Sequence, residues 1–255
     1  MSSDSDILSM FQRLAESNGT AFNVAEDVDP YLRDVKLYPF KPLLELGSEV
    51  GKILEKKPEV AVEVLPRLVG SSFEPTRALA CVVIGRLARY EPAEWMSLAH
   101  HLASDDSWEV REYAAHIFDT HGNIEGLAAF HLDYCFEVLD QWVRDSDYRV
   151  RRVTTNALLG YFLKYPEIGE RLLSLLEPLL SDNSDYVRRN MVFALRTVGK
   201  KQPELVFAFL ESHLDIDRGT TRDIFRQTLD HRWTRGHEDR RDTILKSLSD
   251  NNIKL

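Results

Sequence analysis

DNSDYVR (Asp182–Arg188) is the stretch that decides the fold, because close copies of it stand at Asp105–Arg111 and Asp145–Arg151. In each copy an Asp lies six residues before an Arg, and a Val directly precedes the Arg. Weaker copies keep only the arginine, at Arg77 and Arg222, so that five arginines recur at intervals of 34, 40, 37 and 34 residues. A period of this length without strand signals is typical of stacked helical hairpins, with atypical terminal copies as caps.

Apolar patterning around these copies predicts the hairpins themselves. Apolar residues recur at helical spacing from Pro42 to Lys56 and from Val60 to Val69, and the proline of Lys57-Pro58 separates the two helices. Similar turns stand at Tyr165-Pro166 and Gln202-Pro203. Each predicted helix has one apolar stripe, which a hairpin buries only by stacking on its neighbours. The expected fold class is therefore all-α, an α-solenoid of about five or six helical hairpins.

The polar N-terminal segment differs from the rest of the chain. Residues 1–28 are interpreted as an extension with a short helix near Ile7–Glu16, and residues 29–255 as a single repeat domain. No stretch approaches the roughly 18 uninterrupted apolar residues that span a bilayer. The N-terminus also lacks the basic start and apolar core of a secretory signal. We expect a cytoplasmic protein with no membrane partner.

Metal and cofactor sites are not indicated by the sequence. Cys81 and Cys135 lie inside apolar helical patterns and are interpreted as small core residues in a reducing compartment. The histidines lack metal-ligand spacing with cysteines or carboxylates, and no phosphate-cradling glycine loop is present. We expect no metal and no small-molecule cofactor.

The charge distribution leaves two classes of partner open. A net charge of −9 argues against a protein that binds polyanions non-specifically, since phosphate contacts need a concentrated positive surface. The average nevertheless conceals two basic clusters, which are compatible with a basic groove on an acidic body. They comprise Arg144, Arg149, Arg151 and Arg152, and then Arg188, Arg189, Arg196, Lys200 and Lys201.

The first arginine of each copy has a structural interpretation. In stacked hairpins an Asp in the turn and an Arg at the start of the next helix pair between adjacent repeats, and Asp145 and Asp182 are placed to do this with Arg151 and Arg188. The second arginines, Arg152 and Arg189, lie about 100° further round the helix and need a different environment. Each is either solvated or faces a groove with basic residues of adjacent repeats.

At these residues the chain resembles a known family. The run Asp182–Val206 is similar to the signature repeat of the HEAT-like DNA alkylation repair proteins, and Asp147–Leu158 and Trp108–Ala115 are similar to the two repeats before it. The resemblance covers about residues 70–215. It implies HEAT-like hairpins, and duplex DNA as the partner. Family members that act as glycosylases excise alkylated purines while gripping the DNA backbone on a concave, basic face.

The catalytic residues of the family have few counterparts at the matching positions of this chain. One branch uses a Trp-Trp-Asp run, which this chain lacks, followed by a Trp-x-x-Arg helix whose Arg matches Arg152 and whose Trp matches Arg149. The Trp of that branch's following repeat falls on Phe193. The acids of the other branch fall on Asn156 and Thr197, which cannot stabilise a developing cation as carboxylates would. Glycosylase activity is therefore left open by the sequence.

We call the five recurring arginines and their aspartates the arginine ladder. Within the stretch that it spans, Glu112 is the one acid that we nominate as a substitute for the catalytic acids, since it lies beside Trp108 and Tyr113. A solvated or intrahelically paired carboxylate is the more ordinary explanation of this residue. Two functions follow as hypotheses. In the first, the chain binds duplex DNA, with base excision as an added activity; in the second, it is a protein-interaction scaffold without nucleic-acid binding. The residues expected to contact the DNA backbone are Arg151, Arg152, Arg188, Arg189 and Arg196.

Overall fold

The computed structural model describes residues 2–17, 22–119, 121, 124–215 and 219–250. Its contacts gather into two compact units, Met1–Cys135 (unit 1) and Phe136–Leu255 (unit 2). Over the described ranges every regular element is a helix, apart from one isolated bridge between His121 and Ile124. The predicted class, an all-α solenoid of HEAT-like helical hairpins, is confirmed. The assignment of residues 29–255 to one domain stays a prediction.

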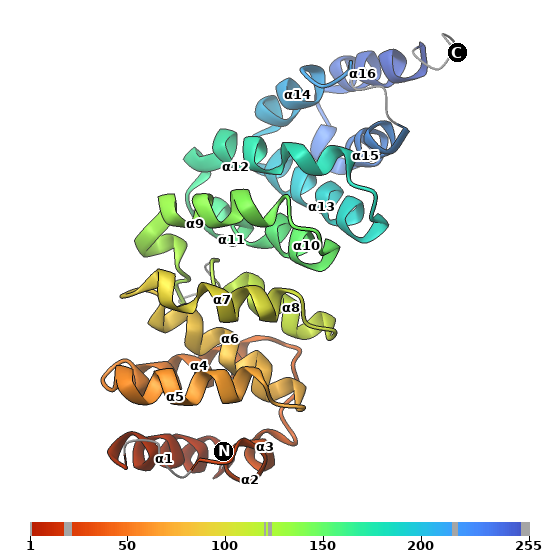
Figure 1. Ribbon diagram of the computed structural model, residues 1–255. Coiled ribbons are helices and arrows are strands. Elements are labelled where there is room, and N and C mark those ends of the chain that lie inside the picture. The colour runs from red at the N-terminus through yellow and green to blue at the C-terminus, as the bar shows by residue number, and fades with distance from the viewer. Residues whose placement is uncertain (1, 18–21, 120, 122–123, 216–218, 251–255) are drawn as a thin grey trace. The chain divides into compact units, whose positions relative to one another are not determined.

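Unit 1 is built from two layers of helices (Figure 1). α4, α6 and α8 pack against one another in sequence order, and α5 and α7 form the second layer. α9 begins in this unit and ends in unit 2. The bounds are α1 Ser2–Glu16, α2 Val24–Asp27, α3 Asp29–Leu32, α4 Lys41–Leu54, α5 Pro58–Val69, α6 Glu74–Leu87, α7 Pro92–Ala103, α8 Trp108–His116 and α9 Ala128–Trp142.

Unit 2 repeats the arrangement. α10, α13 and α15 pack in sequence order, while α12, α14 and α16 form the second layer. The bounds are α10 Tyr148–Asn156, α11 Leu159–Lys164, η1 Pro166–Ile168, α12 Gly169–Leu176, η2 Glu177–Ser181, α13 Asp185–Lys201, α14 Pro203–Glu211, α15 Gly219–Leu229, η3 Arg232–Thr234 and α16 Glu238–Asp250.

Local chemistry explains where these helices begin. Prolines occupy the first turns of α5, α7 and α14, where the missing backbone N–H costs nothing. Ser107 caps α8 by accepting a hydrogen bond from the Val110 amide, and Asp147 caps α10 through the Arg149 amide. The repeated Asp-rich turn is therefore also a set of helix N-terminal signals.

The N-terminal segment is packed rather than detached. α1 starts before the predicted Ile7, and it contacts α3 and α4. Ile7, Met10, Phe11 and Leu14 are buried along one face of α1. Burial of this stripe joins the polar extension to the first helices of unit 1.

Two of the predicted helices are shorter than the sequence pattern suggests. The helix expected from Trp108 to Thr120 ends at His116, and Thr120 itself lies outside the described residues. The helix expected over residues 150–164 is interrupted between α10 and α11. In the turn before the interruption, the hydroxyls of Thr154 and Thr155 donate to backbone carbonyls of the preceding turn.

Both cysteines are core residues, as predicted. Cys81 and Cys135 are buried and unpaired with one another, and burial raises the pKa of each thiol, which keeps it protonated and unreactive. No described helix has the length and apolar character needed to cross a membrane. In the described part of the chain no three His, Cys, Asp or Glu side chains converge as metal ligands would.

Candidate nucleic-acid interface

Two of the repeated aspartates, Asp105 and Asp182, bind the arginine of the preceding copy. Arg77 Nε lies 2.6 Å from Asp105 Oδ2 in unit 1, and Arg151 Nε lies 2.6 Å from Asp182 Oδ2 in unit 2. A second hydrogen bond from Nη2 makes each pair bidentate, at 3.0 and 3.1 Å. The two carboxylates are only 6% and 4% exposed, so these pairs are largely desolvated. Hydrogen bonding to the carboxylate raises the pKa of both arginines.

Each aspartate also closes its own turn. Oδ1 of Asp105 accepts from the Ser107 amide at 2.8 Å, and Oδ1 of Asp182 accepts from the Ser184 amide at 2.7 Å. One carboxylate therefore fixes the turn before a helix and binds the helix of the previous repeat. The two sets of hydrogen bonds together fix the orientation of the aspartate side chain.

The pairing predicted within a copy is corrected by this geometry. Arg188 does not bind the carboxylate of Asp182 but donates to its backbone carbonyl, with Nη1 to O at 2.8 Å, and it also pairs with the exposed Asp185. Arg111 and Arg151 likewise donate to the carbonyls six residues before them, those of Asp105 and Asp145. These contacts give the first arginines a structural role, and for Arg77 and Arg151 the carboxylate partner belongs to the following copy.

The two second arginines lie in different environments. Arg152 is 6% exposed, and its guanidinium lies over the ring of Tyr186, 5.2 Å from the centroid. It is therefore neither solvated nor free to face a groove. Arg189 is exposed near the start of α13. The sequence placed the two residues in equivalent positions and could not separate them, since Tyr186 stands in the next repeat.

Arg189 opens an exposed stripe along α13. Phe193, Arg196 and Lys200 follow it at intervals of four, three and four residues, which places all four side chains on one helix face. Phe193 is 53% exposed and Lys200 is exposed. Arg196 is half-buried because Nη2 donates to the backbone carbonyls of Gln227 and Asp230, at 2.5 and 3.2 Å, where α15 ends. We call these four residues the α13 stripe.

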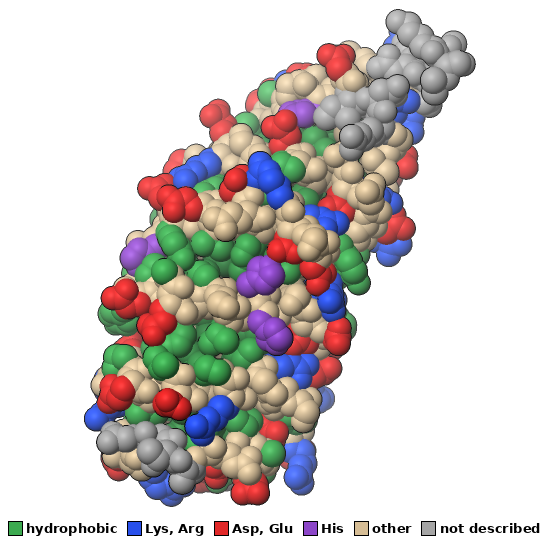
Figure 2. Space-filling model, viewed as in Figure 1, with side chains coloured by type: hydrophobic (Ala, Val, Ile, Leu, Met, Phe, Trp, Pro, Cys, Tyr) green, Lys and Arg blue, Asp and Glu red, His purple; other side chains and the backbone are tan. Residues whose placement is uncertain are grey.

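Charge is not segregated everywhere on the surface. On the face of unit 1 seen in Figure 2, which α5 and α7 present, acidic and basic side chains are scattered in small groups of either sign. A face of this kind does not offer the concentrated positive potential that phosphate binding needs. The α13 stripe, with three cations and an aromatic ring on one helix, is the stronger candidate.

Comparison with known families decides the relationship. The model of the family described as DNA alkylation repair enzyme matches residues 48–223. The chain belongs to this family. Membership supports a function related to DNA repair. No curated protein sequence matches the chain.

Two solved structures from Streptococcus mutans share the fold of this DNA alkylation repair family member. AlkD2 superposes with a TM-score of 0.53 at 20% identity, covering 88% of this chain and 98% of its own. The protein smu.31 from strain UA159 superposes with a TM-score of 0.52 at 21% identity, covering 87% of this chain and 97% of its own. At these identities the likeness concerns the fold.

Glu112, the candidate acid of this family member, is half-buried in α8. Trp108, one helical turn earlier on the same face, is 51% exposed. The neighbouring Tyr113 is buried, and its hydroxyl donates to the Leu37 carbonyl at 2.8 Å. The sequence grouped Glu112 with both aromatic residues, but only Trp108 presents its ring to solvent.

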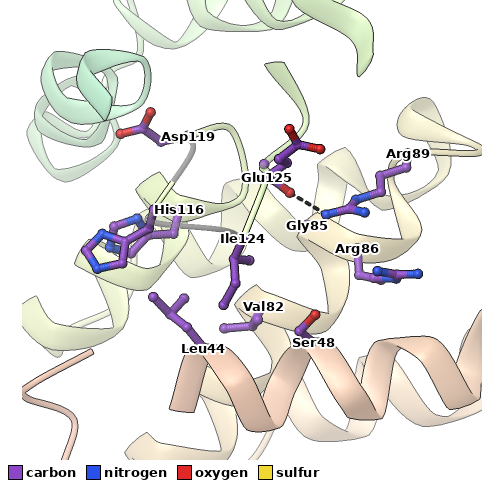
Figure 3. A pocket seen from close by; sticks show the side chains of 12 residues that line it. Leu44, Ser48, Val82, Gly85, Arg86, Arg89, His116, Asp119, Ile124 and Glu125 are labelled. Atoms are coloured by element: carbon purple, nitrogen blue, oxygen red, sulfur yellow. Dashed lines mark hydrogen bonds between the residues drawn. The ribbon is translucent and has the colours of Figure 1, made fainter. Parts of the chain in front are cut away.

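A small pocket in unit 1 carries several ionisable side chains but is not a base-binding site (Figure 3). Arg86 and Arg89 approach from α6 and the residues after it, and His116 and Asp119 approach from the end of α8. Arg89 Nη2 donates to the Glu125 carbonyl across it. The space inside is about 10 Å³, which is room for one water molecule. No nucleobase fits there.

The environment of His116, on the wall of this pocket, leads us to expect that the stability of the protein depends on pH. Burial, with a smaller contribution from the His121 ring 4.9 Å away, lowers the pKa of His116 to about 4. The unfolded state, with a pKa of about 6.5, takes up a proton first as pH falls. The stability that the folded protein owes to a neutral His116 is therefore fully present above about pH 6.5 and is lost progressively toward pH 4. Between pH 7.5 and 5 we expect a loss of about 2 kcal/mol.

Urea unfolding at both pH values measures this loss. His116→Phe removes the titrating group while keeping a ring beside Phe40 and Tyr113, so its stability should fall less over the same range. All other ionisable groups are common to both proteins, which makes the difference between them specific to His116. Parallel pH profiles for the two proteins would contradict the assignment.

Proposed function

We propose that the chain binds duplex DNA through its sugar–phosphate backbone, with the α13 stripe as the centre of the contact. The observation that carries this proposal is the placement of Arg189, Phe193, Arg196 and Lys200 on one exposed helix face. From Arg189 to Lys200 the stripe extends about 16 Å at 1.5 Å per residue. Duplex DNA carries one charge per about 1.7 Å of its axis, so several phosphates come within reach of the stripe.

The other arginines that the sequence predicted as DNA contacts are not part of the α13 stripe, but they hold the helices that carry it. Arg151 and Arg188 are engaged in the turns that precede α10 and α13, and Arg152 lies over Tyr186. These contacts fix α10 and α13 and so hold the exposed cations on a rigid element. In this proposal Arg189 and Lys200 meet phosphates, and Arg196 adds its charge to the stripe while α15 holds its guanidinium. Arg151, Arg152 and Arg188 hold the helices that carry these cations.

Charge reversal of the exposed cations tests the proposal. Arg189→Glu with Lys200→Glu should weaken the binding of duplex DNA at least about tenfold and reduce the slope of log K against log salt by about 2, because two phosphate contacts are lost. Fluorescence anisotropy at a series of salt concentrations measures both quantities. Arg152 is left intact, because a carboxylate at its buried position would disturb folding.

The matched control makes the same charge change elsewhere in unit 2. Arg235 and Lys246 are both exposed and lie outside α13, so Arg235→Glu with Lys246→Glu alters net charge equally. This control should bind DNA more tightly than the stripe variant does. Equal losses of DNA affinity in both variants would mean that the effect comes from net charge alone. If the protein does not bind DNA even at low salt, the hypothesis of a protein-interaction scaffold is favoured instead.

Base excision is a second candidate function, for which the exposed Trp108 beside Glu112 is the favouring observation. An exposed indole stacks on an unpaired base, and a carboxylate nearby stabilises the cation that forms as the glycosidic bond breaks. Release of an alkylated purine from duplex DNA tests this candidate. Glu112→Gln should abolish release without changing DNA affinity, whereas release that survives in the variant removes Glu112 from the role.

A further inference from the structure

A second surface feature lies at the turn between α6 and α7 in unit 1, away from the arginine ladder. A pocket of about 320 Å³ opens where α5 and α7 begin and α6 ends. Its wall is partly apolar, from Pro58 at the start of α5, Leu87 at the end of α6, and the largely buried Trp95 of α7. A pocket of this size accommodates one long side chain from another molecule.

The rim of the pocket is aromatic and acidic. Tyr90 is 64% exposed, which is unusual for so large a ring, and it lies directly before Glu91. Glu91 and Glu94 are both exposed, and neither forms an ion pair with a described residue. The third carboxylate, Glu55, is already neutralised by Arg86, whose Nε lies 2.7 Å from Oε2. The rim therefore carries two uncompensated negative charges beside an exposed π-face.

We propose that this pocket binds an arginine or lysine side chain from a basic segment of a partner protein. The apolar wall accommodates the methylene stem, since long cationic side chains bury their stems while the charged head stays wet. The head then lies against the ring of Tyr90 and the carboxylates of Glu91 and Glu94, an arrangement that favours a cation over a neutral or anionic group. This surface belongs to unit 1 and is acidic, whereas the α13 stripe belongs to unit 2 and is basic.

An equivalent pocket in unit 2 shows which features matter. It lies between the starts of α12 and α14, with about 330 Å³ of space and Glu167, Glu170 and Glu204 at its rim. No aromatic ring lines it, and Glu204 is engaged by Arg240 and lies 3.3 Å from His237. Glu167 and Glu170 are exposed and form no ion pair with a described residue, so the two pockets do not differ in free carboxylates. The exposed ring of Tyr90 is the feature that distinguishes the unit 1 pocket, and on this ground we assign the basic side chain to unit 1.

Amide chemical shifts of the full chain test the assignment directly. The probe is the capped tripeptide Gly-Arg-Gly, titrated into ¹⁵N-labelled protein, with capped Gly-Gln-Gly as the neutral comparison. We expect saturable shifts at residues 87–95 with the arginine peptide only. Tyr90→Ala with Glu91→Gln and Glu94→Gln should weaken this binding about tenfold, through loss of one cation–π contact and two charges.

The control removes two carboxylates elsewhere in unit 1. Glu45 and Glu63 are exposed and each forms an ordinary i,i+4 pair, so Glu45→Gln with Glu63→Gln changes net charge without touching the pocket. It should leave the titration unchanged. Three results would overturn the proposal: shifts spread over all acidic surfaces, equal shifts with the glutamine peptide, or shifts at these amides that depend on protein concentration alone, which would assign the pocket to a second copy of this chain.

Discussion

Replacing Asp182 by alanine should lower the free energy of unfolding by about 3 kcal/mol, because it leaves a largely buried guanidinium without its partner. The carboxylate accepts two hydrogen bonds from Arg151, at 2.6 and 3.1 Å, and one from the Ser184 amide. The side chain of Arg151 is 18% exposed, so water replaces little of what is lost. Urea unfolding followed by circular dichroism measures the change.

Two further variants separate the parts of this effect. Asp182→Asn keeps an oxygen for the Ser184 amide and loses the charge, so its stability should fall between those of the wild type and the alanine variant. Asp185→Ala removes a carboxylate that is 72% exposed and paired with Arg188, and it should change stability by less than about 1 kcal/mol. If Asp182→Ala proves no more costly than Asp185→Ala, the ladder is not a stabilising network.

Alanine at Gly126 should destabilise unit 1 by about 3 kcal/mol or more, or prevent its folding. A Cβ atom there would stand 2.1 Å from the Asp119 carbonyl oxygen and 2.6 Å from the Phe118 carbonyl carbon. These are backbone atoms, and the segments are tied together by hydrogen bonds from the Leu127 amide to Ile117 and from the Ala128 amide to Phe118. The clash therefore cannot be relieved by a side-chain rotation.

Gly219 provides the comparison for this substitution. It is the first residue of α15, and an added Cβ would have no neighbour within 4 Å among the described residues. Gly219→Ala should therefore be neutral, within about 0.5 kcal/mol, or slightly stabilising, because alanine restricts the unfolded chain. Thermal unfolding of both variants gives the comparison. A well-folded Gly126→Ala protein with the stability of Gly219→Ala would show that the connection between α8 and α9 is not closely packed.

The hairpin architecture was predictable from the sequence because it depends on local signals. Asp182 and Arg188 mark the turn and the helix start, and the prolines at 58 and 203 mark the return helices. Both cysteines were assigned correctly to the core, since an apolar helical pattern already determines burial. The break between α10 and α11 was missed, because the apolar residues keep their helical spacing through it.

The candidate site was less predictable because it depends on neighbours from other repeats. Arg152 and Arg189 follow the same motif, yet Tyr186 lies against the first and solvent surrounds the second. Arg196 looks like a surface cation in the sequence, but the end of α15 engages its guanidinium. No property of a single repeat reveals these contacts, because each partner residue lies about one repeat away in the chain.

Asp182 both closes its own turn and binds Arg151 of the preceding repeat. This double role limits where repeats of this kind can gain or lose residues. The distance between successive arginines varies from 34 to 40 residues, whereas the Asp-to-Arg interval stays at six in all three complete copies. One residue added within those six would misplace both the turn bond of Asp182 and the carbonyl bond of Arg188. Insertions and deletions should therefore accumulate in the return helices and their loops, and growth by duplication should proceed in whole copies that carry both residues.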